Sequence, residues 1–206
     1  ISDKEHNSNF LPWKELADQG KIDLEIVPTN NDNQIEMEVY EEAIEGQVNR
    51  GGMKLVSLVY TSNLDGVTFP LPTLFEHAKE NGFLTHADAA QYIPHNELDV
   101  NHLKADFVTF SGHKILGPTA TGVLWGKYDL LEQLPPFIVG GGTPFDLTYE
   151  QTTYQKPPMK FEAGLQHYAG IIGLGAAIDY LDSLYKEYGT DAIAQQEKER
   201  NKELKE

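Results

Sequence analysis

A lysine that directly follows a short apolar strand is the residue of this sequence best placed to carry out chemistry. Residues 107–110 are apolar or β-branched, as in a buried strand, and the polar turn that begins at Ser111 leads to His113 and Lys114. Open α/β sheets bind ligands at the carboxyl ends of their strands. An amine that is partly removed from water at such a place is a usable nucleophile. The chemistry that fits Lys114 is therefore a Schiff base with a carbonyl compound.

A carboxylate upstream of this lysine supplies a second candidate for the same site. Most lysines are solvated surface charges, so Lys114 alone does not establish a site. Residues 83–87, however, form another apolar run, which ends at Asp88 and is followed by two alanines and Gln91. Lys114 follows Asp88 by 26 residues, about the length of one crossover and the next strand in a parallel sheet. We therefore expect Asp88 and Lys114 to share one crevice.

Composition and charge exclude several classes of partner. The 206 residues include 32 acidic and 16 basic side chains, which gives a formal charge of −16. This charge repels polyanions, so we expect no nucleic-acid partner and no association with anionic membranes. No apolar run is long enough to span a bilayer, and no secretory signal opens the chain, so we expect a cytoplasmic protein.

The residues that commonly bind metal give no metal site. The chain contains no cysteine, which excludes disulfides and thiolate ligands within these residues. Its seven histidines form no pair with the spacing of metal ligands. We therefore expect no metal.

The order of the apolar segments predicts an α/β fold. Strands are expected at residues 22–27, 55–60, 83–87, 107–110 and 122–126. Helices are expected at residues 11–17, 35–44, 71–81, 100–104 and 128–133, with a long helix after residue 164 and a charged helical end at 180–206. This alternation predicts a mostly parallel sheet with at least one deviant strand and helices on both faces, in three α/β/α layers. The glycine run at 140–142 is expected to be a flexible loop.

The motifs Asp88-Ala-Ala-Gln91 and Ser111-Gly-His-Lys114 resemble the class V aminotransferase family of pyridoxal-phosphate (PLP) enzymes, and most closely its cysteine desulfurase and selenocysteine lyase branch. Residues 5–9, 61–63, 161–164 and 169–181 extend the resemblance over nearly the whole chain. It implies that residues 1–206 are most of the large PLP-binding domain, truncated at both ends and without the small C-terminal domain. It also implies a homodimer that acts on an amino acid, with a sulfur-acceptor protein as a further partner.

The resemblance assigns the reactive residues. Lys114 would hold PLP as a Schiff base and would move the α-proton of the substrate, and Asp88 would face the pyridine nitrogen. His6 would stack on the cofactor ring as the second catalytic residue.

The remaining cofactor contacts also come from the resemblance. Gln91 would donate to the phenolic oxygen of the ring, and Asn63 to that oxygen or to the substrate carboxylate. Ser111 and His113 would donate to the phosphate.

Two positions depart from the pattern of the branch. Asn7 stands where a second histidine is usual, which leaves the stacking position at His6 intact. Leu165 stands where a threonine usually reaches the phosphate in the partner subunit, and leucine has no donor.

Other parts of the branch's usual site lie outside these residues. The helix that binds the phosphate would precede Ile1, while the mobile cysteine and the carboxylate-binding arginine would follow Glu206. We therefore expect the isolated 206 residues to bind PLP weakly and to be inactive.

Several functions remain open from the sequence. A class V aminotransferase or another PLP lyase would carry the same motifs. A catalytically silent α/β module that only binds a partner is the alternative of another class. A nucleotide-binding domain is disfavoured because no Gly-x-Gly-x-x-Gly or Walker loop follows a strand.

Overall fold

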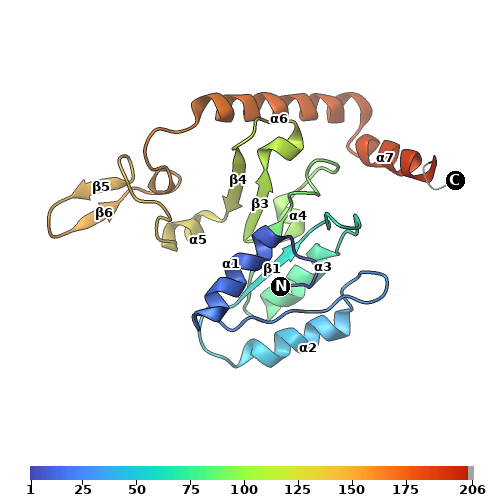
Figure 1. Cartoon of the computed structure of the whole chain (residues 1–206), viewed down its shortest axis with the longest axis horizontal. Helices are drawn as coiled ribbons and strands as arrows, with labels where there is room; N and C mark the ends of the chain where they lie inside the picture. Colours follow the sequence, from blue (N-terminus) through green and yellow to red (C-terminus); the bar gives the residue numbers. More distant parts are fainter. Residues whose placement is uncertain (204–206) are drawn as a thin grey trace.

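The central element is a four-stranded sheet in the order β1-β2-β3-β4 (Figure 1). The computed structural model describes residues 1–203. The strands are β1 (Leu55–Val59), β2 (Leu84–Asp88), β3 (Phe107–Ser111) and β4 (Gly122–Gly126). The first three run parallel and β4 runs antiparallel to β3, which confirms the mostly parallel sheet with a deviant strand.

Helices connect and cover these strands. The α-helices are α1 (Asn7–Asp18), α2 (Met37–Val48), α3 (Leu71–Glu80), α4 (Val100–Leu103), α5 (Tyr128–Gln133), α6 (Tyr168–Tyr188) and α7 (Ala192–Glu203), and two short 3-10 helices are η1 (Gly112–Ile115) and η2 (Met159–Phe161). Each predicted helix has a counterpart among residues 1–203, with ends that shift by a few residues. The helical end expected at 180–206 is interrupted at residues 189–191, and residues 204–206 lie outside the described residues.

The two faces of the sheet carry different side chains because successive residues of a strand point to opposite sides. On one face, Val56 and Leu58 join the buried core with Leu74 and Phe75 of α3. On the other face, the hydroxyl of Ser57 donates to Asn9 of α1 at 2.6 Å. Helices therefore flank both sides of the sheet, as expected, and α1 lies over the polar face.

The strand predicted at residues 22–27 is wrong. These residues form no strand, and only Val27 makes an isolated parallel bridge, to Ser2. The N–H of Val27 donates to the carbonyl of Ile1, and the N–H of Asp3 donates to the carbonyl of Val27. The alternating pattern was real, but a strand needs a partner along its length, and here the pairing ends after one residue.

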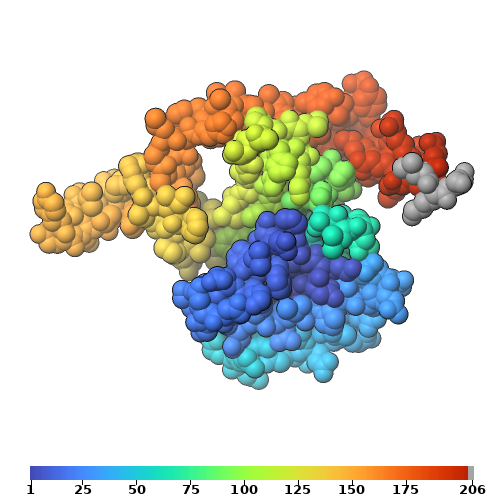
Figure 2. Space-filling model, in the orientation of Figure 1, coloured from blue at the N-terminus to red at the C-terminus, as the bar shows by residue number. Residues whose placement is uncertain are grey.

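The segment after β4 leaves the sheet. It contains a two-stranded hairpin of β5 (Pro144–Leu147) and β6 (Thr152–Tyr154), which was not predicted from the sequence. Figure 1 shows this hairpin far from the central sheet, and Figure 2 shows it as a projection from the molecule. We call residues 137–154 the arm and residues 1–126 the sheet body.

Helix α6 crosses the end of the sheet and contacts η1 (Figure 1). Its glycines permit this approach, since a Cβ atom on Gly173 would lie 2.6 Å from Cγ of Pro118. One on Gly170 would lie 2.9 Å from Cγ2 of Thr121. Gly170 and Gly173 therefore serve close packing, whereas a Cβ atom on Gly175 would have nothing within 4 Å.

Two further expectations concern membranes and metals. Over residues 1–203, no helix combines the length and the apolar character that crossing a bilayer requires. The same residues contain no group of three or more histidine, aspartate or glutamate side chains arranged to hold a metal ion.

Candidate functional site

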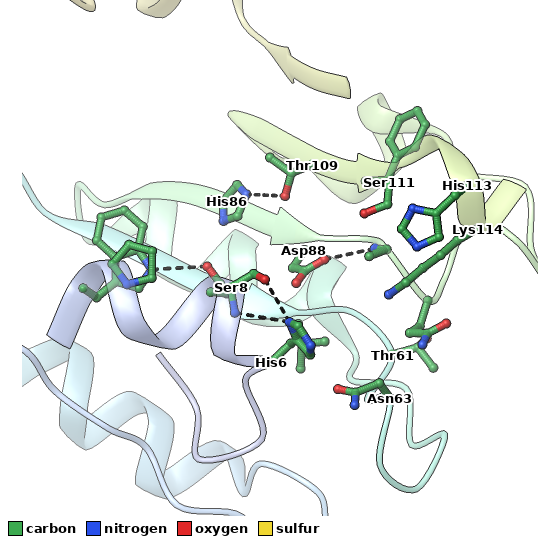
Figure 3. A pocket seen from close by; sticks show the side chains of 17 residues that line it. His6, Ser8, Thr61, Asn63, His86, Asp88, Thr109, Ser111, His113 and Lys114 are labelled. Carbon is green, nitrogen blue, oxygen red and sulfur yellow. Dashed lines mark hydrogen bonds between the residues drawn. The ribbon is translucent and has the colours of Figure 1, made fainter. Parts of the chain in front are cut away.

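A pocket of about 610 Å³ opens at the carboxyl ends of the parallel strands (Figure 3). Its wall is built from the start of α1, from the ends of the strands, and from the loops that follow β1, β2 and β3. All seven residues proposed from the sequence line it: His6, Asn63, Asp88, Gln91, Ser111, His113 and Lys114. Segments more than a hundred residues apart therefore meet in one cavity of a size that suits a small-molecule ligand.

Asp88 forms the floor. It is the last residue of β2 and is 9% exposed. One of its carboxylate oxygens, Oδ1, accepts a hydrogen bond from the N–H of Ala90 at 3.0 Å. That bond orients the carboxylate. Among residues 1–203, no side chain donates a hydrogen bond to the other oxygen, Oδ2. A buried carboxylate with a free oxygen is suited to bind a cationic N–H group.

Lys114 reaches the pocket from η1, the turn that follows β3. Its side chain extends toward the middle of the cavity (Figure 3), and no partner for its ammonium group is recorded among residues 1–203. The turn depends on Gly112, where a Cβ atom would lie 2.1 Å from Oγ1 of Thr121. Leu116 closes the turn at a φ of 65°, a left-handed conformation. The local fold thus fixes the backbone and leaves the amine free.

His6 lies on the opposite side of the cavity, at the start of α1. It caps that helix, because its Nδ1 accepts a hydrogen bond from the N–H of Ser8 at 3.2 Å. An Nδ1 that accepts carries no proton, so in the neutral ring the proton is on Nε2. The cap fixes the imidazole at the mouth of the pocket.

The rim carries hydrogen-bond donors. Asn63 and His113 are exposed, while Gln91 and Ser111 are partly buried. Asn63 lies in the loop after β1, Gln91 in the loop after β2, and Ser111 at the end of β3.

The charge of the pocket differs from that of the whole chain. Asp88 is the one acidic side chain in its lining, and Lys114 is the one basic side chain apart from histidine. A chain with a net charge of −16 therefore keeps its acidic groups out of this cavity, apart from the floor. This lining tolerates an anionic group at the rim and a cationic one at the floor.

Several lining residues were missed in the sequence. His86 and Thr109 lie on the floor beside Asp88, and Asn9 and Trp13 come from α1. The alternation in β2 held the signal for His86, because it precedes Asp88 by two residues and so lies on the same face. No short motif marked the residues of α1, whose position depends on the packing of that helix.

Comparison with known proteins places this chain in a family. The family model described as "Aminotransferase class-V" matches residues 1–206. A "Probable cysteine desulfurase" from Streptomyces coelicolor is 42% identical over 184 residues, which are 89% of this chain and 43% of that protein. A cysteine desulfurase from Dickeya dadantii is 39% identical over 194 residues, covering 94% and 45%. The chain thus spans about half the length of the curated relatives it matches.

Solved structures agree with the sequence relatives. The cysteine desulfurase CsdA from Escherichia coli superposes with a TM-score of 0.81 at 34% identity, over 88% of this chain and 44% of that one. The apo structure of a cysteine desulfurase from Thermococcus onnurineus NA1 gives 0.81 at 34% identity, over 89% and 45%. With a match over its whole length and a sheet-end pocket lined by the motif residues, this chain belongs to the class V aminotransferase family.

Proposed function

We propose that the natural polypeptide carrying these 206 residues is a PLP-dependent enzyme of the cysteine desulfurase or selenocysteine lyase type, which releases alanine from its amino-acid substrate. The observation that carries the proposal is the meeting of Lys114 and Asp88 in one pocket. Relatives of the family that bear the name cysteine desulfurase support the reaction type. Residues 1–206 would then form most of the large PLP-binding domain.

The pocket fits PLP by the chemistry of its donors and acceptors. PLP carries an aldehyde, a ring nitrogen that is protonated in its active form, and a phosphate. The aldehyde requires an amine, which Lys114 supplies. The ring nitrogen requires a carboxylate with a free oxygen, which Asp88 supplies. The phosphate requires donors, and Ser111 and His113 lie at the same end of the pocket as Lys114 (Figure 3).

Each residue then has a distinct task. When bound, PLP would supply an electron sink that stabilises negative charge at the α-carbon of the substrate. Lys114 would hold the cofactor covalently and would move the α-proton on its Nζ atom. Asp88 would hold the proton on the ring nitrogen, since a carboxylate favours the cationic form. His6 would stack on the ring, where its cap at the helix start holds the imidazole in place.

The remaining rim residues would orient the cofactor and the substrate. Gln91 would donate to the phenolic oxygen, and Asn63 to that oxygen or to the substrate carboxylate. Leu165 would add no phosphate donor, and its side chain is 91% exposed.

We also propose that the protein is a homodimer and that its arm belongs to the interface. Phe145 of the arm is 76% exposed and Phe137 is 96% exposed, which is unusual for aromatic side chains of a monomer. A second copy of this chain would cover them. A sulfur-acceptor protein remains a proposal from the family resemblance, and a cytoplasmic location remains a proposal from the sequence.

The test uses the natural polypeptide purified with added PLP. We expect an absorption band near ~410–430 nm, reduction of that band by borohydride with the label on Lys114, and release of alanine from cysteine or selenocysteine. A coloured protein that transfers the amino group to a keto acid, without releasing alanine, would support the class V aminotransferase alternative. A colourless protein with no turnover would support the silent binding module.

A further inference from the structure

A chain of side-chain hydrogen bonds runs beneath the pocket and crosses four secondary-structure elements. Nδ2 of Asn9 donates to Oε2 of Glu5 at 2.6 Å, and Oδ1 of Asn9 accepts from the hydroxyl of Ser57 at 2.6 Å. Oγ of Ser57 lies 2.7 Å from Nδ1 of His86. Nε2 of His86 lies 2.9 Å from the hydroxyl of Thr109. The chain therefore links α1, β1, β2 and β3, and ends in the lining of the pocket.

The direction of these bonds can be worked out from one fixed donor. The indole Nε1–H of Trp13 can only donate, and it donates to Oδ1 of Asn9 at 3.2 Å. This contact fixes the orientation of the Asn9 amide, so the hydroxyl of Ser57 must donate to Oδ1 as well. Ser57 has then used its single proton, and its oxygen accepts from His86. The proton of the His86 ring is therefore on Nδ1.

The opposite side of the His86 ring follows from its charge. Burial lowers the pKa of His86 to about 4, and the nearby Asp88 acts weakly in the other direction. The ring is thus neutral near pH 7, and its Nε2 has a lone pair and no proton. Thr109 must donate its hydroxyl proton to that lone pair. Its oxygen then has only lone pairs left for the pocket.

This arrangement makes the floor of the pocket an acceptor surface. Thr109 is the register partner of Asp88 across β2 and β3, and both side chains line the cavity. With the hydroxyl turned toward His86, the Thr109 oxygen and the Asp88 carboxylate both present lone pairs. A ligand group that meets this floor must bring a donor, preferably with positive charge.

We propose that His86 is a positioning residue of this site: a neutral ring protonated on Nδ1, it holds Thr109 as an acceptor beside Asp88 and ties α1 to the sheet. The floor thereby selects a protonated ring nitrogen, and the spacing between His6 and the floor is fixed. The selection of a protonated ring nitrogen is the recognition half of this inference, and it rests on the proposed function. The protonation state of His86 is a property of the chain itself.

The first experiment determines which nitrogen of the His86 ring carries the proton, without any cofactor. The 206-residue chain is labelled with ¹⁵N-histidine, and two-bond ¹H–¹⁵N correlations are recorded near pH 7. The His86→Leu variant identifies the signals of His86. We expect a protonated Nδ1 and an unprotonated Nε2. A proton on Nε2 alone, or on both nitrogens, would overturn the inference.

The second experiment measures how the floor of the pocket affects the dissociation rate and the absorption of the bound cofactor. In the natural polypeptide loaded with PLP, the variants Thr109→Val and Thr109→Ser are compared. Valine keeps the shape of threonine and removes the hydroxyl, whereas serine keeps the hydroxyl. We expect the cofactor to dissociate about tenfold faster from the valine variant, the effect of one lost hydrogen bond, and to show a shifted absorption maximum. The serine variant should match the wild type.

Equal dissociation rates and spectra for valine and serine would overturn the recognition half, provided that both variants unfold at the wild-type temperature. Should the valine variant unfold earlier, His86→Leu is the second variant, and its spectrum is compared with the wild type below both unfolding temperatures. An unshifted spectrum would then count against the inference. If the wild type binds no PLP, the proposed function fails with the recognition half, and the tautomer result still decides the state of His86.

Discussion

The sheet body and the arm differ in the burial of their large apolar side chains. The described residues of the sheet body enclose a core that contains Leu58, Phe69, Phe75 and many others at 1% exposure or less. After Gly126, the buried hydrophobic side chains of the described residues are Leu174, Ala177 and Leu181. The arm, by contrast, exposes its large apolar side chains.

This difference separates chemistry from association. The sheet body satisfies its own polar groups and holds the pocket on strands whose positions the core fixes. The arm has little core of its own, so its apolar surface gains free energy only when another surface covers it. We therefore expect changes in the sheet body to affect the site and the fold, and changes in the arm to affect association.

The largest expected effect is at Lys114. Replacement of Lys114 by alanine removes the amine, so we expect turnover of the natural polypeptide to fall by about 10³-fold or more and borohydride to trap no cofactor. Lys156→Ala is the matched control, because Lys156 is exposed and lies outside the pocket. Peptide mapping after reduction reads the outcome, and a label on another lysine in the wild type would contradict it.

Asp88→Asn comes next in size. The change keeps the shape and removes the charge that would hold the proton on the ring nitrogen. We expect PLP to remain bound and turnover to fall by roughly 10²-fold, as for the loss of one well-placed electrostatic group. Steady-state kinetics and the cofactor absorbance are measured together, and near-normal turnover would show that Asp88 is not the ring partner.

A stability effect is expected at Asp106, at the opposite end of β3 from the pocket. This buried carboxylate lies 2.8 Å from the ammonium of Lys79 and 2.7 Å from that of Lys127, and it accepts from the N–H of Thr85. We expect Asp106→Asn to lower the free energy of unfolding by about 2 kcal/mol. This loss is smaller than that from breaking a fully buried ion pair, because both lysines are partly exposed. Asp18→Asn, in an exposed ion pair, should change it by less than about 0.5 kcal/mol.

The same carboxylate predicts a dependence of stability on pH. Burial alone would raise the pKa of Asp106, but the hydrogen bonds from Lys127 and Lys79 outweigh it and hold the pKa below its ordinary value of 3.8. A pKa that is lower in the folded state stabilises the fold above 3.8, and this contribution is lost as the pH falls below that value. Denaturant unfolding from pH 7 to pH 3 should therefore bring the wild type closer to Asp106→Asn, and a constant difference would contradict the assignment.

The smallest expected effect on stability is in the arm. We expect Phe145→Ser with Tyr149→Ser to change the free energy of unfolding of the monomer by less than about 0.5 kcal/mol, because both side chains are exposed, yet to abolish the proposed dimer. Light scattering measures the mass. Met53→Ser is the control, since Met53 is equally exposed but lies outside the arm. A wild type that is already monomeric would remove the arm from any interface.

The sequence by itself determined the parts of this protein that depend on local pattern. Apolar runs predicted the four strands of the sheet, and the positions of Asp88 and Lys114 at strand ends predicted that they share a crevice. Strand ends of a parallel sheet meet at one edge, so local order was enough to bring these two side chains together.

Tertiary structure decided what depends on partners distant in the chain. Residues 22–27 have the alternation of a strand but form only one bridge, whereas the arm pairs two strands that no sequence pattern predicted. The roles of Asn9, Ser57 and Thr109 at the floor follow from α1 lying across the sheet. The proton on Nδ1 of His86 depends on Trp13, which lies 73 residues before it, and such a contact exists only after the chain has folded.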